Sequence, residues 1–134
     1  GFSKFAPKEQ EGWKAIVATT KKMQTMYGIN IIIPTGTAIQ IARNTDLNTP
    51  HSLTHDGRHL SYGVSQYIAA CSVYQSLIAP TFGISIEGNR SRHTLTNAEK
   101  EESYYKNDYR NVTDANAAAC QSCATRAAVH WDKQ

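Results

Sequence analysis

The stretch GINIIIPTGTAIQIAR, residues 28–43, decides the fold that the sequence predicts. Its first part, residues 29–33, is a short run rich in β-branched side chains, bounded by a glycine and a proline. Such a run is typical of a strand covered on both faces, as in a parallel sheet. Residues 34–43 then begin a short helix, for which Thr35 or Thr37 is the expected N-cap.

Helical patterns flank this stretch on both sides. Between residues 9 and 27, apolar residues recur at helical spacing with lysines between them, which predicts an amphipathic helix. A second apolar stripe runs over residues 64–78, and a last helix with a small-residue packing face is expected over about 115–129. Because a helix that leads into a buried strand is half of a βαβ unit, the sequence predicts an α/β fold.

Composition indicates one globular domain, or part of one, over residues 1–134. Apolar residues make up 40% of the chain and charged residues 19%, close to the usual values for soluble globular proteins. The net charge is +3 and the basic residues are scattered, so we expect no nucleic-acid partner and no binding to anionic membranes. No stretch approaches the ~20 consecutive apolar residues that a membrane span requires.

Residues 44–60, NTDLNTPHSLTHDGRHL, carry the most suggestive spacing of the chain. They are dense in turn formers, so we expect an ordered loop, placed where α/β enzymes usually carry catalytic residues. One chain reversal lets Asp56 accept the Nδ1 proton of His59 while Nε2 faces a nucleophile, as in a hydrolase triad. The alternative interpretation is a common Asp-Gly turn followed by a polar surface histidine.

Five more residues are candidates for contact with a substrate. By their position near the expected strand end and in the loop, four of them are candidate pocket-lining residues: Thr37, Gln40, His51 and His55. Arg58 lies between Asp56 and His59, the two residues of the expected catalytic dyad. Capping or surface hydrogen bonding is the alternative interpretation for the first four, and exposure to solvent for Arg58. We expect no metal and no organic cofactor.

The three cysteines leave a redox or metal protein as a further interpretation. An odd number cannot form a closed disulfide framework. Cys120 and Cys123 form a CxxC pair, with His130 as a third possible metal ligand. Neither a βαβ redox context nor a second ligand pair accompanies them, so packing as small apolar side chains is the preferred interpretation.

Three segments together resemble a known superfamily. They are IIIPTGTAIQIARNT, LTHDGRHLSYGVSQYIAACSVYQSLI and VTDANAAACQSCATRAAV. They resemble the C-terminal half of a bacterial branch of the SGNH (GDSL-like) hydrolase superfamily, in a group usually described as a domain of unknown function. The resemblance covers residues 13–83 and 112–129. Its most specific element is DGRHLS, residues 56–61, which is similar to that superfamily's last motif, DxxH.

The resemblance implies both a fold and an activity. The fold would be a flavodoxin-like three-layer αβα sandwich with a parallel sheet, in which residues 29–33 form the last strand. Asp56 would orient His59, the general base of a Ser-His-Asp triad. The enzyme would be a serine esterase acting on small acyl esters, esters of carbohydrates among them. Relatives of this kind are often exported to the periplasm or the outside of a bacterium, and the sequence itself leaves the localisation open.

The superfamily's nucleophilic serine and its oxyanion residues have no counterpart in residues 1–134. Residues 88–91, Gly-Asn-Arg-Ser, contain an inserted arginine and follow the base, so we do not accept them as the nucleophile block. The chain is therefore expected to be the C-terminal portion of a catalytic domain. An N-terminal fragment or a second chain would carry the serine, and the chain would not be stable as a monomer.

A non-catalytic carbohydrate-binding or interaction module with an SGNH-like fold is the alternative function. Aromatic side chains combine an apolar ring with a polar group and suit such a role. The candidates are Tyr62, Tyr67, Tyr74, Tyr104, Tyr105 and Trp131. Most of them fit the apolar stripes of the helices equally well.

Overall fold

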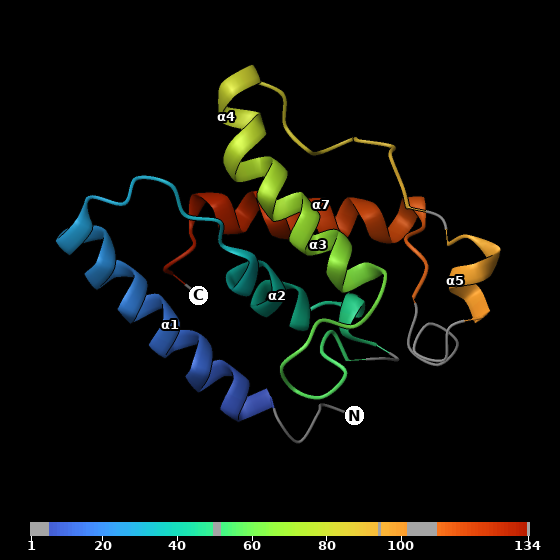
Figure 1. The fold of residues 1–134 in the computed structure, drawn as a ribbon, viewed down its shortest axis with the longest axis horizontal. Coiled ribbons are helices and arrows are strands. Elements are labelled where there is room, and N and C mark those ends of the chain that lie inside the picture. Colours follow the sequence, from blue (N-terminus) through green and yellow to red (C-terminus); the bar gives the residue numbers. More distant parts are fainter. Residues whose placement is uncertain (1–5, 50–51, 94, 102–109, 134) are drawn as a thin grey trace.

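The computed structural model describes residues 6–49, 52–93, 95–101 and 110–133, and these residues fold as helices and connecting loops (Figure 1). The elements are α1 (Ala6–Tyr27), α2 (Thr35–Arg43), the 3₁₀ turn η1 (Asp46–Asn48), α3 (Val64–Val73), the π-helical segment η2 (Tyr74–Ile78), α4 (Ala79–Phe82), α5 (Asn97–Glu101) and α7 (Asp114–Val129). The segments α3, η2 and α4 follow one another without a break.

The predicted α/β fold, a flavodoxin-like αβα sandwich with a parallel sheet, is wrong. In the described ranges β-structure is limited to two isolated bridges, Thr54 with Leu60 and Gly63 with Arg110. Residues 29–33 form an irregular connection between α1 and α2. Its β-branched side chains satisfy the local preference of a strand, but a strand also needs a neighbouring backbone. Because no described segment pairs with this run, no sheet forms.

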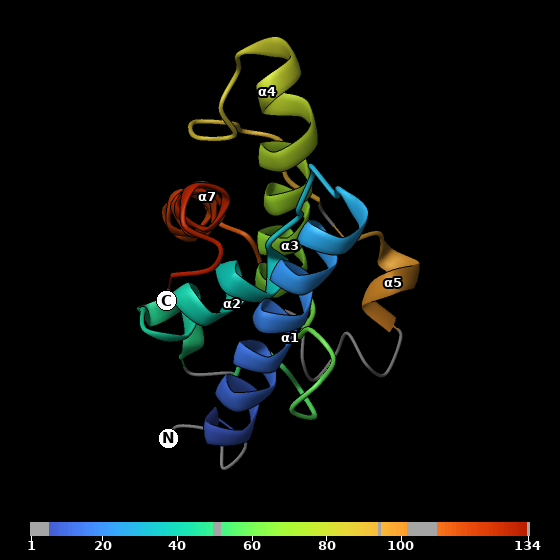
Figure 2. The same ribbon diagram turned by 90° about the vertical axis from the view of Figure 1, so that its left-hand side faces the viewer.

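The core lies where α2 and α3 pack against α7, which Figure 2 shows end-on beside α2. The predicted last helix is confirmed as α7, and all its buried side chains except that of Gln121 are small: Ala117, Cys120, Cys123, Ala124 and Ala127. At its start, the Thr113 hydroxyl accepts a hydrogen bond from the amide of Asn116 at 3.3 Å, and the Asn116 side chain accepts one from the Thr113 amide at 2.8 Å. This reciprocal capping makes Thr113 the N-cap of α7.

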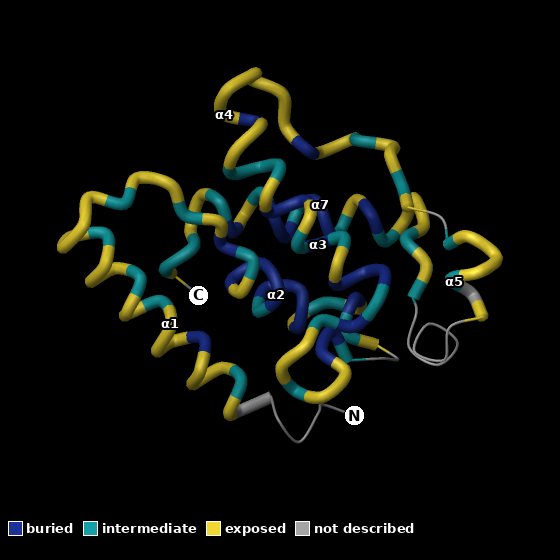
Figure 3. Tube along the Cα trace, viewed as in Figure 1, coloured by how far each residue is buried: buried dark blue, intermediate teal, exposed yellow. Residues whose placement is uncertain are grey.

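Helix α1 is confirmed as a helix, but most of its apolar stripe faces solvent (Figure 3). Ile16 is 66% exposed and Tyr27 is 68% exposed, whereas Trp13 is only 7% exposed. The indole Nε1 of Trp13 donates a hydrogen bond to the hydroxyl of Thr37 at 3.0 Å. Thr37 is therefore a buried contact between helices and caps nothing, because α2 begins after Pro34 without a side-chain cap.

Gly63, at the start of α3, lies directly against the backbone of Arg110. Its φ is +80°, and an added Cβ would lie 1.9 Å from the carbonyl oxygen of Arg110. On either side of it, the amide of Val64 donates to that carbonyl and the amide of Arg110 donates to the carbonyl of Tyr62, both at 3.1 Å. Two backbone hydrogen bonds thus hold residues 62–64 against residue 110.

We expect Gly63→Ala to lower the free energy of unfolding by roughly 3 kcal/mol, because the clash with Arg110 adds to the strain of a positive φ. Gly88→Ala is the matched control, since Gly88 has a φ of +81° but no atom within 4 Å of its added Cβ. The control should cost only about 1 kcal/mol. Urea denaturation of both variants measures the difference, and equal losses would contradict the close approach.

Candidate functional site

The candidate site lies on the loop between η1 and α3, which the backbone folds into a tight turn. The amide of His55 donates to the carbonyl of His59 at 3.1 Å, and the amide of Ser61 donates to the carbonyl of Leu53 at 2.9 Å. Gly57, at the tip, has a φ of +82°, which glycine adopts without steric cost. The two ends of the turn are therefore held together by backbone hydrogen bonds.

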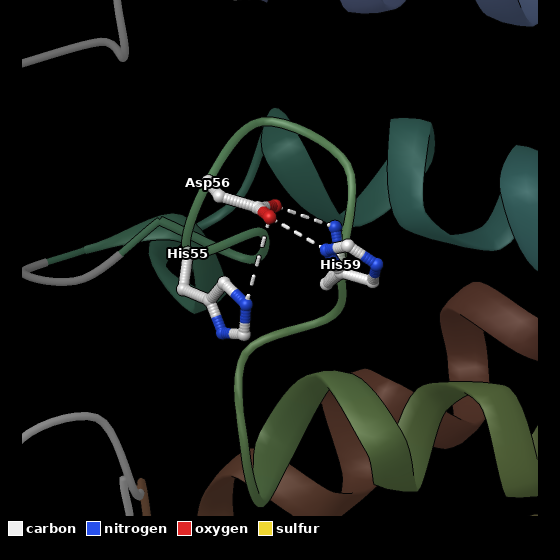
Figure 4. A group of neighbouring side chains, drawn as sticks. All are labelled: His55, Asp56 and His59. Atoms are coloured by element: carbon white, nitrogen blue, oxygen red, sulfur yellow. Dashed lines mark hydrogen bonds and ion pairs between the residues drawn. The ribbon is translucent and has the colours of Figure 1, made fainter.

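The turn brings Asp56 and His59 into direct contact (Figure 4). The Nδ1 atom of His59 lies 2.5 Å from Oδ2 of Asp56. The other carboxylate oxygen accepts backbone N–H bonds from Arg58 at 2.9 Å and from His59 at 2.7 Å. The carboxylate is thus held in place by the backbone on one side and contacts the imidazole with the other.

These hydrogen bonds hold the pKa of Asp56 well below its usual range. The backbone N–H of His59 has the largest effect, followed by its imidazole and by the backbone N–H of Arg58. Each donor stabilises the ionised carboxyl more than the neutral one. The carboxylate therefore remains charged around neutral pH and can stabilise a protonated imidazole beside it.

His55 and His59 both face Oδ2 of Asp56, from different sides (Figure 4). Its Nε2 atom is 3.9 Å from Oδ2 of Asp56, and the two imidazole rings have centroids 5.8 Å apart. One ligand atom from each of His55, Asp56 and His59 lies within 4.8 Å of those of the other two. Among the described residues, this is the group whose ligand atoms could converge on one metal ion.

A cleft of about 980 Å³ opens beside the dyad, between α1, α2 and the turn. Of the predicted contact residues, Gln40 and Arg58 line this cleft. Thr37 does not, because it is buried between α1, α2 and the chain after α7, where its hydroxyl donates to the carbonyl of Trp131 at 2.6 Å. His51 lies outside the described residues.

The sequence analysis missed a buried ionic network in the wall of the cleft. Arg43 and Glu9 form an ion pair at 2.5 Å, and each side chain is only 9% exposed. The hydroxyl of Thr54 donates to Glu9 at 2.7 Å and accepts from Arg43 at 3.1 Å. Thr54 lies in the first arm of the turn, where it pairs with Leu60, so this network ties the turn to α1 and α2. The sequence held one indication of a buried charge, because Arg43 directly follows the apolar side of the predicted short helix.

The cysteines do not support the redox or metal alternative. All three thiols are buried, and burial raises the pKa of Cys71 to about 11 and that of Cys120 to about 12. A thiol must lose its proton to act as nucleophile or metal ligand. In the described part of the chain, Cys120, Cys123 and His130 also do not gather as a metal-ligand group. The cysteines are packing residues of the core.

The aromatic residues named for a carbohydrate-binding surface belong to different environments. The hydroxyl of Tyr67 accepts hydrogen bonds from Gln121 at 2.9 Å and from Arg92 at 3.1 Å, and its ring packs against the core. The ring of Tyr62 lies 5.7 Å from that of His55, beside the turn. Tyr104 and Tyr105 lie outside the described residues.

We expect His59→Ala to raise the pKa of Asp56, but not all the way to its usual value of 3.8. The variant loses the imidazole donor but keeps the backbone N–H of residue 59, which is the larger cause of the lowered pKa, so the value should stay below 3.8. Carboxyl ¹³C NMR titration measures the shift. The pKa of Glu99, lowered by hydrogen bonds from Thr96, is an internal control and should not move. An Asp56 pKa at 3.8 or above in the variant would contradict the backbone contribution.

The lowered pKa of Asp56 also makes the free energy of unfolding depend on pH. Because the folded-state pKa of Asp56 lies below its usual value of 3.8, the stabilisation from this carboxylate is fully present above that pH. It is lost as the pH falls toward the folded-state pKa.

Helix α1 forms a buried ion pair through Glu9 and a more exposed one through Lys21, and the buried pair should contribute far more to stability. We expect Glu9→Gln to cost roughly 3 kcal/mol, because it leaves the guanidinium of Arg43 buried without a countercharge. Asp132→Asn is the control: it breaks the ion pair with Lys21, whose side chain is 51% exposed, and should cost less than about 1 kcal/mol. Chemical denaturation compares them, and similar losses would argue against a buried network.

Comparison with known proteins identifies a family. Neither the curated proteins nor the solved structures contain a match to this chain. None of the helices in the described ranges combines the length and the apolar character that a membrane crossing needs. The model of a domain of unknown function, DUF4886, matches residues 1–113, which include the dyad, the cleft and the buried ion pair. The chain therefore belongs to the DUF4886 family.

Proposed function

We propose that this chain supplies the general base and the orienting carboxylate of an acyl-hydrolase site that cleaves small esters. The observation that carries the proposal is the 2.5 Å contact between His59 Nδ1 and Asp56 Oδ2, on a turn that lines a large cleft. The likeness of DGRHLS to the DxxH motif of SGNH hydrolases supports it. The α/β fold of those enzymes is no part of the proposal.

In the proposed reaction, His59 moves one proton twice. Its Nε2 takes the proton of a serine hydroxyl while the serine oxygen attacks the ester carbonyl, and then gives that proton to the leaving alcohol. Asp56 accepts the Nδ1–H bond and stabilises the imidazolium that exists between these steps. Water then cleaves the acyl-serine ester with the same base, which returns the site to its starting state.

The proposal places the nucleophile on a polypeptide segment other than the described residues. Within those residues, His59 forms its side-chain contact with Asp56, and no serine or threonine hydroxyl is hydrogen-bonded to its Nε2. A segment of the same polypeptide or a second chain would bring the serine and the oxyanion donors to the open side of His59. Each such donor is typically worth about 3 kcal/mol in the transition state.

The cleft supports small esters as the substrate class. Trp13, Ile16 and Ile39 supply apolar wall next to the dyad, which suits an acyl group. Gln40 and Arg58 supply hydrogen-bond donors in the same cleft. These donors would contact the polar alcohol side of an ester, such as the hydroxyl-rich ring of an acetylated carbohydrate.

The test uses the protein together with every polypeptide that co-purifies with it. His59→Ala should lower kcat/KM for p-nitrophenyl acetate by about 10²- to 10⁴-fold, the usual contribution of a general base. Asp56→Asn, which keeps an acceptor for the backbone of the turn, should also lower it strongly. Free imidazoles hydrolyse this ester slowly, so His93→Ala is the matched control. His93 is exposed and lies 3.8 Å from the carboxylate of Glu99.

Two results would contradict the proposal. The first is a loss of activity in His59→Ala that is no greater than in His93→Ala. The second concerns the nucleophile: an alkyl fluorophosphonate should label one serine in the active preparation, in a His59-dependent manner, and peptide mass spectrometry would locate it. Activity without any labelled serine would exclude the serine mechanism.

A further inference from the structure

The turn that carries the dyad offers a second imidazole to the same carboxylate. Oδ2 of Asp56 lies 2.5 Å from Nδ1 of His59 and 3.9 Å from Nε2 of His55. The two rings are tilted by 37° rather than stacked. Three atoms with lone pairs thus surround one point on the surface of the turn (Figure 4).

The three atoms suit one class of ion. Imidazole nitrogen together with carboxylate oxygen is a donor set typical of zinc-class divalent ions, whereas magnesium and calcium prefer oxygen alone. Bonds of about 2.1 Å to a tetrahedral ion place neighbouring ligand atoms roughly 3.4 Å apart. The ligand atoms here lie within 4.8 Å of one another, so small rotations of the side chains bring them to that spacing.

Solvent reaches all three side chains, so an ion can approach them. The side chain of His55 is 30% exposed, that of Asp56 46% and that of His59 74%. The backbone hydrogen bonds of the turn keep all three Cα positions in place while the rings turn. Three protein ligands would leave a fourth position for water or for another ligand.

We propose that His55, Asp56 and His59 form a binding site for a divalent transition-metal ion of the zinc class. The metal and the proton exclude each other at His59, because Nδ1 needs its lone pair for the metal and a hydrogen for the bond to Asp56. Metal binding therefore breaks the hydrogen bond of the dyad. In combination with the proposed hydrolase function, the ion acts as an inhibitor.

Isothermal titration calorimetry with Zn²⁺ alone tests the binding. The full chain should bind about one ion per chain with all three ligands in place. His55→Ala should weaken binding by more than about 10-fold, since even the loss of a group that only orients a ligand typically costs 10- to 100-fold. His93→Ala, which removes an exposed imidazole beside a single carboxylate, should leave the affinity unchanged, and Mg²⁺ should not bind.

NMR of the imidazole nitrogens gives a second, independent measurement. Addition of Zn²⁺ should shift the ¹⁵N signals of both His55 and His59, including Nδ1 of His59. The inference is overturned by Zn²⁺ affinity that is the same in wild type and His55→Ala, or by a titration in which neither histidine signal moves. Because the wild-type NMR titration requires no variant, a folding defect in His55→Ala would not obscure the answer.

Inhibition separates this inference from the proposed function on which it depends. The activity of His55→Ala toward p-nitrophenyl acetate, measured relative to its own activity without Zn²⁺, should resist inhibition by Zn²⁺ better than that of the wild type. If Zn²⁺ binds through His55 without lowering a His59-dependent activity, the metal site stands and its exclusion of the dyad is wrong. If His59-dependent activity is found but no Zn²⁺ binds, the metal site is wrong and the hydrolase proposal stands.

Discussion

Close approach of three helices through small side chains is the constraint on which the rest of the described structure depends. Ala117, Ala124 and Ala127 of α7 are completely buried, as are Ala38 and Ala42 of α2. Small side chains let helix axes lie near one another, and cores at this density tolerate little added volume. The contact holds α2 and α3 on α7. The turn with the dyad connects these two helices, so their packing also sets its position.

Charged and polar contacts then attach α1 and the turn to this core. Helix α1 buries little apolar surface, and its contacts include the Trp13 hydrogen bond and the ion pair of Glu9 with Arg43. Burying charges is costly unless they are paired and hydrogen-bonded, and the hydroxyl of Thr54 bonds to both partners. The same three side chains form part of the cleft, so one network both holds α1 in place and shapes the space beside the dyad.

The dyad itself is a local structure for which we propose two uses. Its hydrogen bonds connect residues no more than three positions apart. In the proposed hydrolysis the exposed imidazole exchanges a proton at Nε2, whereas in the proposed metal site it binds the ion through Nδ1. What distinguishes the two uses is the surroundings: His55 supplies another metal ligand, whereas the cleft with Gln40 and Arg58 supplies room for an organic substrate. The proposed hydrolysis and the proposed metal site therefore compete for one pair of side chains.

The sequence by itself determined the features that depend on neighbouring residues. Thr113 caps α7 through Asn116, and Gly28 ends α1 with a φ of +64°. The contact between Asp56 and His59 could likewise be anticipated from an Asp-Gly turn, because a hydrogen bond across three residues needs no distant partner.

Only the tertiary structure decided what distant segments do to one another. Residues 29–33 have the composition of a strand, yet pairing requires another backbone, and the described chain places none beside them. The apolar stripe of α1 predicts one buried face, but spacing does not say what covers it, and Trp13 alone of its large apolar side chains is buried. Glu9 and Arg43 are 34 positions apart in the sequence, so no local pattern could reveal their pairing. Burial and pairing are decided by contacts between segments, which local preferences do not contain.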